Sequence, residues 1–362
     1  QRVEYAPMAV RGYTALLPPK KRSPRRRDER QPRSDSSSMP PKEIPSSMQA
    51  ATIHKYGDPS VLRVEDLPTP QPKGAQLLVK VHYAGVNPVD WKMREGRNRL
   101  VLGPGWPKVL GHDLAGEVVA VGPRVKRFAV GDAVYTMQGL GMGAYATHAL
   151  VPEKTAARMP ASLTFQEAAA LPMTSLTALQ VLRHIAKLAP GQKLLVNGAS
   201  GGVGSSAVQL GKILGAEVTG VCSTRNVALV RGLGVDHVVN YDEGDFAAAG
   251  VTYDVIFDCV GNRSLADSKA ALAKKGVFVS VTTNAGKLVT NGVCNLFRAQ
   301  RETQIIVAIP SAKDLDWVAE QVAAGHYRPV LDRTFPLAEI RAAHEYSETG
   351  RARGKITIEM PG

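Results

Sequence analysis

Cysteine is scarce in this sequence, with only Cys222, Cys259 and Cys294 among 362 residues. Their scattered positions include no C-x-x-C spacing, which excludes a disulfide framework and a cysteine-rich structural zinc site and is typical of a reducing compartment. Long apolar runs are also absent: none reaches the length of a membrane span, and no secretory apolar segment is visible near the start. With 44% hydrophobic and 21% charged residues, the chain has the composition of a soluble globular protein, long enough for two domains.

Positive charge is concentrated at the start of the chain. The formal net charge is +13, and residues 1–47 carry eleven Lys and Arg against five acids. This Pro-, Ser- and Arg-rich segment has too few apolar side chains to offset the entropy cost of ordering, so we expect it to be disordered. Three interpretations of this segment are open: a transit peptide, a basic arm for nucleic acid or membrane, or sequence upstream of a natural start at Met48. No aromatic residue interrupts the basic run Lys20–Arg27 to stack bases, so we expect at most weak nucleic-acid binding there.

The stretch Leu194–Gly204 organises the rest of the chain. A short apolar run leads into a loop with glycines spaced G-x-x-G-G-x-G, and a helical pattern follows that puts on one face Val203, Ala207, Leu210 and Leu214. A strand, a Gly-rich turn and a helix N-terminus form the arrangement that a dinucleotide pyrophosphate needs. The spacing is one residue longer than the strict fingerprint, so the interpretation depends on the surrounding elements.

Further strand-like runs follow the glycines, separated mostly by helical patterns. They are Val218–Cys222, His237–Asn240, Asp254–Asp258, Val277–Val281 and Gln304–Ile309. Apolar strands that alternate with amphipathic helices predict a parallel sheet covered on both faces. With the first run they make six strands, the number in a complete dinucleotide-binding domain of the Rossmann type.

The end of the second of these strands indicates which dinucleotide binds. An NAD site usually has an Asp or Glu there to accept the ribose hydroxyls, whereas this chain has Cys222-Ser223-Thr224-Arg225-Asn226. The nearest acids, Glu217 and Asp236, lie outside the turn. A guanidinium and hydroxyls bind a 2′-phosphate that a carboxylate would repel, so NADPH is the expected cofactor. An Arg at the start of a solvated helix is the alternative interpretation.

The segments on both sides of this domain are rich in predicted strands. From Met48 onward, short runs punctuated by Pro and Gly predict antiparallel strands with long loops, which suggests a partly closed barrel. These runs are residues 51–57, Leu62–Glu65, Gln76–His82, Gly116–Val121 and Ala133–Thr136. A helix over Leu171–Leu188 leads into the dinucleotide domain. After it, Arg328–Phe335, Leu337–Ser347 and Gly354–Met360 predict strand, helix and a last strand that returns to the first domain.

The order of barrel, dinucleotide domain and return strand resembles the medium-chain dehydrogenase/reductase superfamily. Within it, the chain is similar to zinc-independent quinone oxidoreductases and 2-alkenal (enone) reductases, including plant chloroplast-envelope quinone oxidoreductase-like proteins. The resemblance covers residues 48–362 and rests on Asn87–Lys92, Gly111–Val119, Leu176–Gln180, Ala199–Gly204, Cys222–Asn226 and Gly354–Ile356. It implies an α/β fold: a basic tail over residues 1–47, a GroES-like catalytic domain over 48–172 and 327–362, and a Rossmann NADP-binding domain over 173–326.

The resemblance also implies where the cofactor binds, in the cleft between the two domains. Thr177 would lie near the nicotinamide, the glycines under the pyrophosphate, and Ser223, Arg225 and Tyr241 around the 2′-phosphate. Relatives often have a Lys where this chain has Asn226, so Arg225 has to supply that charge. The full set of expected cofactor-binding residues is Thr177, Gly201, Gly202, Val203, Gly204, Ser223, Arg225, Asn226, Tyr241, Cys259, Val260, Thr282 and Lys355.

Zinc-dependent members of the same superfamily differ at the residues that hold the metal. They have a ligand Cys where this chain has Asn87, and a Gly-His-Glu with a second ligand where this chain has Gly111-His112-Asp113. A catalytic zinc needs three protein ligands, and here one His remains without its Cys. The stretch after Gly139 also lacks the four-cysteine lobe that binds structural zinc. We therefore expect no bound metal, and we expect His112 to pack or form hydrogen bonds.

Without a metal, an activated alkene or a quinone is an easier substrate than a simple alcohol. Hydride addition at the β-carbon of an enone moves negative charge to the carbonyl oxygen, where hydrogen-bond donors stabilise the enolate, and quinones accept hydride by the same logic. The candidate catalytic residues are Asn87, which would bind cofactor or substrate, and Lys92, which would face the enolate. Asp90 would orient Lys92 or cap the following turn, and a loop-stabilising ion pair between the two is an open alternative.

The sequence thus predicts a zinc-independent reductase that uses NADPH to reduce small quinones or α,β-unsaturated carbonyl compounds. An enoyl-thioester reductase is an alternative, with Arg94, Arg97 and Arg99 available for coenzyme A phosphates. A structural or RNA-binding protein that binds NADPH is an alternative of another class. We expect a homodimer in the cytoplasm, with organelle import through residues 1–47 as an alternative.

Overall fold

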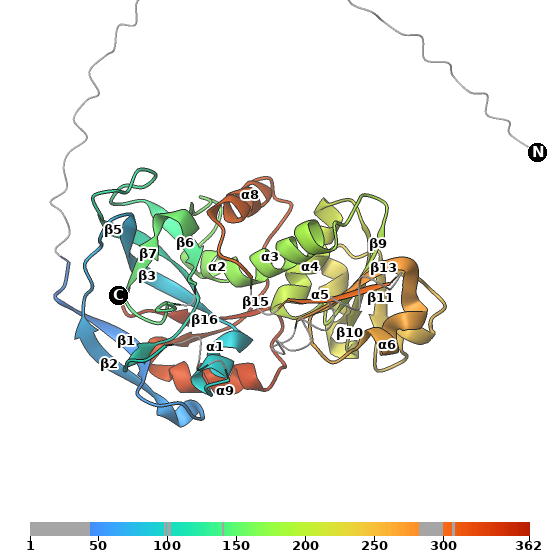
Figure 1. The fold of residues 1–362 in the computed structure, drawn as a ribbon, viewed down its shortest axis with the longest axis horizontal. Coiled ribbons are helices and arrows are strands. Elements are labelled where there is room, and N and C mark those ends of the chain that lie inside the picture. Colours follow the sequence, from blue (N-terminus) through green and yellow to red (C-terminus); the bar gives the residue numbers. More distant parts are fainter. Residues whose placement is uncertain (1–43, 98, 100–102, 140, 282–299, 306–307) are drawn as a thin grey trace, which may run out of the picture. The chain divides into compact units, whose positions relative to one another are not determined.

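Three β-sheets organise the part of the chain that the structure describes. This computed structural model describes residues 44–97, 99, 103–139, 141–281, 300–305 and 308–362. One sheet has six strands, one has seven and one has three. Figure 1 shows the six-stranded sheet and its helices next to the part built from the first and last segments of the sequence.

The six-stranded sheet is parallel throughout and has the strand order β11-β10-β9-β12-β13-β14. Its strands are β9 (Lys193–Asn197), β10 (Glu217–Cys222), β11 (His237–Asn240), β12 (Tyr253–Asp258), β13 (Leu272–Val281) and β14 (Arg301–Ile305). This order is that of a dinucleotide-binding domain, which confirms the six strands predicted from the sequence. Residues 306–307 of the expected run Gln304–Ile309 lie outside the described residues, and β14 begins three residues earlier than expected.

Helices cover this sheet and link it to the rest of the chain. They are α3 (Pro172–Leu179), α4 (Gly202–Ile213), α5 (Val227–Gly232), α6 (Leu265–Ser268) and α8 (Ala312–Ala323). The helix expected over Leu171–Leu188 is α3, which continues as a π-helical segment over Gln180–Ile185. Every residue of α3 is buried, because this helix packs beside α4 on one side and against β5 (Asp113–Val121) and β6 (Ala133–Met137) on the other (Figure 1).

The seven-stranded sheet has the strand order β15-β16-β3-β5-β6-β8, with β7 also paired to β3. Its strands are β3 (Gln76–Val86), β5 (Asp113–Val121), β6 (Ala133–Met137), β7 (His148–Pro152), β8 (Ala156–Arg158), β15 (Leu331–Pro336) and β16 (Lys355–Glu359). The three-stranded sheet consists of β1 (Ser47–Ile53), β2 (Leu62–Pro68) and β4 (Lys108–Val109). Three of these strands, β4, β7 and β8, were not predicted from the sequence, because they are short and mostly apolar without clear alternation.

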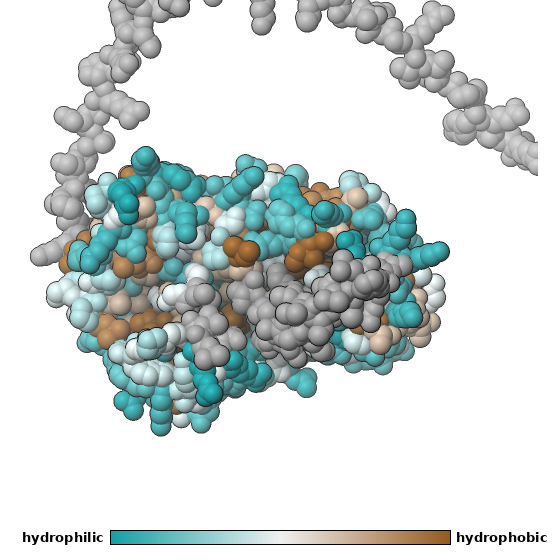
Figure 2. Space-filling model, in the orientation of Figure 1, coloured by the Kyte–Doolittle hydropathy of each residue, from teal (hydrophilic) through white to brown (hydrophobic). Residues whose placement is uncertain are grey.

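Shorter helical elements complete this half. The α-helices are α1 (Pro88–Arg94), α2 (Phe165–Ala169) and α9 (Ile340–Glu348). Single 3₁₀ turns cover Pro59–Val61, Glu153–Thr155, Thr224–Asn226, Phe246–Ala248, Lys269–Ala271 and Leu337–Glu339. No helix of the described residues is long and apolar enough to cross a bilayer. On the face drawn in Figure 2, hydrophobic residues lie in separate small patches among hydrophilic ones.

The last strand returns to the first half, as expected. β16 lies between β15, with which it is parallel, and β3, with which it is antiparallel. This return places Lys355, the first residue of β16, beside Val86 and Asn87 at the end of β3. At the other end of the chain, β1 begins at Ser47, and Ser46 O accepts a hydrogen bond from Thr69 N, so ordered pairing starts slightly before Met48.

Candidate active site

One cleft of about 1180 Å³ lies between the six-stranded sheet, here called the Rossmann sheet, and the seven-stranded sheet. It is lined by α1, α3, the glycine-rich loop with the start of α4, the ends of β10 to β13, and the segment between α9 and β16. Most of the expected site residues line it: Asn87, Lys92, Thr177, Gly201, Gly202, Val203, Gly204, Ser223, Arg225, Asn226, Tyr241, Cys259, Val260 and Lys355. Asp90 does not line it, and Thr282 lies outside the described residues.

The glycine-rich loop forms one side of the cleft with its backbone. Gly198 has a positive φ of 79°, a conformation that favours glycine, and α4 begins at Gly202. A Cβ at Gly204 would lie 2.1 Å from the Gly198 carbonyl oxygen, so only glycine lets the helix start this close to the strand. A Cβ at Gly202 would contact Lys355 and Thr174 at 3.1 Å, so the two halves meet here. The backbone N–H groups in the first turn of α4 are suited to an anion.

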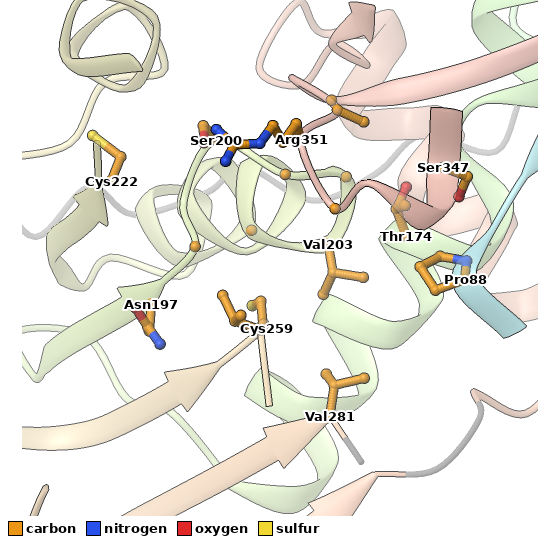
Figure 3. Close-up of a pocket in the computed structure, with 18 of the residues that line it drawn as sticks. Pro88, Thr174, Asn197, Ser200, Val203, Cys222, Cys259, Val281, Ser347 and Arg351 are labelled. Carbon is orange, nitrogen blue, oxygen red and sulfur yellow. The ribbon is translucent and has the colours of Figure 1, made fainter. Parts of the chain in front are cut away.

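Polar and cationic side chains follow β10 at the far end of the cleft. Asn226 Nδ2 donates to Ser200 Oγ at 3.0 Å and to Ser223 Oγ at 3.2 Å. Its buried Oδ1 has no partner in the described part of the chain, so it is an acceptor available to a ligand. Arg225 donates to the backbone oxygen of Arg351 at 3.1 Å, and both arginines line the cleft, some of whose lining residues are drawn in Figure 3. Two guanidinium groups therefore lie at this end.

Asp242 also lines this end of the cleft, and the sequence analysis missed it. Its carboxylate accepts hydrogen bonds at 2.9 Å from the backbone N and the hydroxyl of Thr224. These two bonds lower its pKa, which keeps it ionised. A carboxylate that already holds Thr224 has less capacity left for ribose hydroxyls. Arg351 was missed too, although the run Gly350-Arg351-Ala352-Arg353 directly before Gly354 was a readable basic signal.

A buried hydrogen-bonded triad forms the opposite side of the cleft. Lys355 Nζ donates to Asn87 Oδ1 at 2.6 Å, to the Val86 carbonyl oxygen at 3.0 Å and to Asp113 Oδ2 at 3.2 Å. Asn87 Nδ2 donates to the same Asp113 oxygen at 2.9 Å. All three side chains are almost fully buried. An ammonium group thus sits against Asn87, the position where zinc-dependent members have a ligand cysteine.

Asp113 links this triad to α3. Its second oxygen accepts a hydrogen bond from the Met173 backbone at 2.9 Å, in the first turn of the helix that carries Thr177. Burial raises its pKa, and the charge of Lys355 and the hydrogen bond from Asn87 oppose that rise. Asp113 stands in a motif that the sequence analysis quoted, but a pairing across 242 residues leaves no local signal.

Asp90 lies behind the cleft, where it organises α1 from within. One of its oxygens is 2.5 Å from His112 Nδ1, and the other accepts from Asn87 N and Tyr145 Oη, both at 2.8 Å. Burial opposes ionisation of Asp90, but the charge and hydrogen bond of His112 outweigh it, so the pKa is lowered. Asp90 therefore contacts His112 and caps its own helix, and no ion pair with Lys92 is seen in the described structure. His112 forms a hydrogen bond, as expected.

Lys92 and Trp91 line the cleft next to Asn87. The ammonium of Lys92 lies 5.4 Å from the Trp91 ring centroid, and the Arg97 guanidinium lies 5.2 Å from it. Burial lowers the pKa of Lys92, and the positive charge of Arg97 adds to this effect. A half-buried ammonium with a lowered pKa is a better proton donor than an ordinary lysine.

Arg94, at the end of α1, is fully buried and points away from solvent. It pairs with Glu348 at 2.7 Å, donates to the Gly57 carbonyl oxygen at 3.0 Å and meets His344 Nδ1 at 3.3 Å. Burial lowers the pKa of His344 to about 4, so this ring is neutral and accepts from Arg94. Arg94 is thus engaged inside the protein, which removes one of the three arginines considered for coenzyme A phosphates.

Residue types that bind metal ions are dispersed in the part of the chain that the structure describes. No group of three His, Cys, Asp or Glu residues that could hold a metal ion occurs in the described ranges. Cys259 lines the cleft, and burial raises the pKa of its thiol well above the usual value, so this cysteine is a neutral lining group.

Comparison with known proteins agrees with this architecture. Two family models match, one described as an alcohol dehydrogenase GroES-like domain over residues 73–161, the other as a zinc-binding dehydrogenase over 233–358. The chloroplast envelope quinone oxidoreductase homolog of Arabidopsis thaliana is 35% identical over 323 residues, 86% of this chain and 98% of that protein. The chloroplastic NADPH-dependent alkenal/one oxidoreductase of Arabidopsis thaliana is 33% identical over 327 residues, 87% of this chain and 80% of that protein. The solved structure of the quinone oxidoreductase from Coxiella burnetii has a TM-score of 0.80 at 33% identity, covering 87% of this chain and 100% of its own.

Proposed function

This chain belongs to the medium-chain dehydrogenase/reductase superfamily, among its quinone and alkenal/one oxidoreductases, and on that premise we propose that it is a zinc-independent reductase that uses NADPH. Its substrates are small quinones or the activated C=C bond of alkenals and enones. The observation that carries the proposal is the shared cleft, in which the glycine-rich loop and the Asn87–Lys355 pair face one another. The homodimer, the cytoplasmic location and the domain boundaries expected from the sequence stay predictions.

The residues of the cleft fit a dinucleotide with an additional phosphate. The start of α4 offers backbone N–H groups to the pyrophosphate, and a Cβ is tolerated poorly at Gly202 and Gly204. Arg225 and Arg351 supply positive charge at the far end for the 2′-phosphate, and Asn226 Oδ1 offers an acceptor to ribose or base. The alkenal/one oxidoreductase relative is itself named NADPH-dependent, which supports the same choice.

The reaction needs a donor for the substrate oxygen more than it needs a nucleophile. When bound, NADPH supplies the hydride. Lys92 donates a hydrogen bond to the carbonyl or quinone oxygen as negative charge develops there, and its lowered pKa matches it to this role. Trp91 holds the ammonium of Lys92 against an aromatic face on the cleft side. Asp90 fixes the first turn of α1, so that Asn87 and Lys92 keep their positions.

The chemistry of the groups at the metal position supports catalysis without zinc. An ammonium beside an amide is a poor environment for a divalent cation, because both charges are positive and the amide oxygen is already used by Lys355. The same ammonium stabilises the buried Asp113 carboxylate, which would otherwise lack a counter-charge. The zinc-binding description of one matching family model is therefore not extended to this chain.

One assay series tests the proposal. The full chain is given 2-alkenals, cyclic and open-chain enones and quinones, and the consumption of NADPH and of NADH is followed separately. We expect turnover of several of these compounds with NADPH, and slower turnover with NADH at equal concentration. Activity only with enoyl-thioesters, or equal use of both cofactors, would overturn the proposal.

A further inference from the structure

We propose that Asn87 is a fixed hydrogen-bond donor to the substrate oxygen, and that Lys355 and Asp113 are positioning residues that hold its amide in that orientation. The inference rests on the proposed function and adds a second donor to Lys92. Its physical basis is the chemistry of the two partners of the amide, which differ in what they can donate and accept.

The orientation of the Asn87 amide is determined by what its partners can do. An ammonium has donors only, so the amide atom 2.6 Å from Lys355 Nζ has to be the oxygen. The atom 2.9 Å from Asp113 Oδ2 has to be the nitrogen, since a carboxylate accepts. A flipped amide would place NH₂ against the ammonium and oxygen against the carboxylate. This pair of contacts removes the usual ambiguity between the two amide orientations.

These two contacts leave one Nδ2 proton of the Asn87 amide for a further hydrogen bond. The oxygen accepts from Lys355 and one Nδ2 proton is donated to Asp113, so the second Nδ2 proton has no acceptor among the residues that the structure describes. Asn87 is 3% exposed and lines the cleft that Lys92 also lines. Asn87 Nδ2 can therefore donate a hydrogen bond to a group in the cleft, whereas its oxygen already accepts one from Lys355.

Asn197, the corresponding asparagine on the Rossmann side, shows the contrast. It also lines the cleft and is buried, but its Nδ2 donates both to Asp258 Oδ1 and to Asn262 Oδ1 at 2.9 Å. Both of its protons are engaged, so it has no donor left for a ligand. Of these two buried asparagines that line the cleft, Asn87 is the one with a free proton.

A donor that does not move is most valuable where charge appears during the reaction. The Asp113–Lys355 pair makes rotation of the amide costly, so the donor needs no reorganisation when the enolate or hydroquinone oxygen forms. A substrate that presents a carbonyl oxygen next to the reacting carbon fits this donor, whereas a substrate that has to donate a proton to Asn87 does not. The geometry thus favours substrates whose nearest polar atom is an acceptor.

The test exchanges the two members of the amide–carboxylate pair. Asn87→Asp puts two carboxylates around one ammonium and removes the donor, so we expect a lower melting temperature and a kcat/KM for an enone reduced about 100-fold. The double variant Asn87→Asp with Asp113→Asn restores an amide–carboxylate pair around Lys355, so its melting temperature should return close to that of the unmodified protein. Its kcat/KM should stay about 100-fold low, because the carboxylate now at position 87 has no proton to give to the cleft.

One further readout and two further variants complete the test. The dissociation constant of NADPH, titrated without substrate, should be unchanged in the double variant, because the donor serves the substrate. Asn87→Ala, which adds no charge, should give the same loss of kcat/KM and covers the case in which Asn87→Asp does not fold. Asp113→Asn alone is the matched control: it leaves both amide protons on Asn87 and should reduce kcat/KM less than Asn87→Asp does.

Three outcomes would overturn the inference. Recovery of kcat/KM together with melting temperature in the double variant would mean that Asn87 is only structural. NADPH binding weakened in proportion to kcat/KM would mean that the amide serves the cofactor. A double variant that stays as destabilised as Asn87→Asp would disprove the positioning role. If the unmodified protein reduces none of the compounds, the proposed function fails, while the melting temperatures still test the pairing.

Discussion

The two sides of the cleft are built in opposite ways. The cofactor wall, on the Rossmann side, comprises Gly201, Gly202, Gly204, Arg225, Tyr241 and Val260. The catalytic wall comprises Asn87 and Lys355, which line the cleft, and the side chains that hold them from behind, Asp90, His112 and Asp113. On the cofactor wall, backbone N–H groups and exposed side chains face the cleft, with Tyr241 and Val260 each 56% exposed. On the catalytic wall, no residue is more than 4% exposed, and the side chains hold one another.

This difference separates binding from positioning. A solvated wall of exposed side chains is sufficient for an anion, because charge attraction tolerates small shifts of an exposed guanidinium. A donor to a developing oxyanion has to be held within a fraction of an ångström, and buried networks of satisfied hydrogen bonds provide that rigidity. Substitution of an exposed side chain on the cofactor wall should therefore mainly weaken binding, whereas substitution of a buried side chain on the catalytic wall should lower folding stability and turnover together.

Asp90→Ala tests the catalytic wall most severely. It removes the partner of His112, Tyr145 and the Asn87 backbone N–H at once, so we expect a loss of about 3–5 kcal/mol in the free energy of unfolding, measured by chemical denaturation. The matched control is Asp242→Ala, which removes an exposed carboxylate from the other side of the cleft and should leave the unfolding curve unchanged. Similar losses in both variants would contradict the contrast between the walls.

The pH dependence of Asp90 sharpens this test. Its pKa is lower in the folded protein than in the unfolded chain, so its contribution is present above the unfolded value of about 3.9 and is lost as the pH falls through the folded value. The stability difference between the unmodified protein and Asp90→Ala should therefore be constant near neutral pH and shrink below about pH 4. A difference that stays constant into strong acid would mean that the charge of Asp90 is not what stabilises α1.

Gly204→Ala tests the backbone of the cofactor wall. A methyl group 2.1 Å from the Gly198 carbonyl oxygen forces the loop and α4 apart, so we expect a loss of about 1–3 kcal/mol in stability and a clear weakening of NADPH binding. Calorimetric titration and thermal melting measure the two effects. Gly201→Ala is the control for stability, since its added Cβ would lie 3.5 Å from the nearest atom, an ordinary contact. An equal drop in melting temperature for both variants would show that the close approach of Gly204 to the Gly198 carbonyl oxygen is not the cause of the loss of stability.

Arg225→Ala tests the side chains of the same wall. Arg225 is exposed, so screening by solvent limits its contribution, and we expect the Michaelis constant for NADPH to rise about tenfold while that for NADH changes little. Low ionic strength should enlarge the effect. Unchanged thermal stability is expected in the same variant. An increase that is equal for both cofactors would show that Arg225 does not recognise the 2′-phosphate.

Chelation of metal ions should have the smallest effect of all. Prolonged treatment with EDTA or phenanthroline should leave the turnover unchanged, because the ammonium of Lys355 occupies the neighbourhood of Asn87. Elemental analysis of the purified protein provides the second measurement. Stoichiometric zinc in the protein, together with a loss of turnover after chelation, would contradict the proposal that the enzyme works without a metal ion at Asn87.

The contrast between the walls also explains what the sequence could predict. The cofactor wall depends on glycines that are close in the chain and on strands with local apolar patterns, so Gly204, Arg225 and the six-stranded sheet were accessible from the sequence. Within the catalytic wall, the sequence offered two roles for Asp90, to orient Lys92 or to cap the following turn. The structure shows the cap, through the Asn87 backbone N–H, together with a partner that the sequence did not indicate, His112, 22 residues away. From the sequence alone, a residue close in the chain is the expected partner of a carboxylate. In the folded protein, the partner is the group that the sheets place next to it. The roles of Asn87 and Lys92 stay predictions.

The return of β16 to β3 also sets the order in which the catalytic wall can form during synthesis. Asp113 precedes Lys355 by 242 residues, and at translation rates of about 5–20 residues per second the ammonium follows the carboxylate by roughly 10–50 s. During that interval, the strands of the seven-stranded sheet that have already been made contain Asp113 and Asn87 without the Lys355 ammonium that pairs with them. The six-stranded sheet, in contrast, forms from strands that follow one another in the chain. The half of the molecule that begins first on the ribosome is therefore the half that finishes last, and aggregation or chaperone capture of nascent chains should concentrate on residues 47–158.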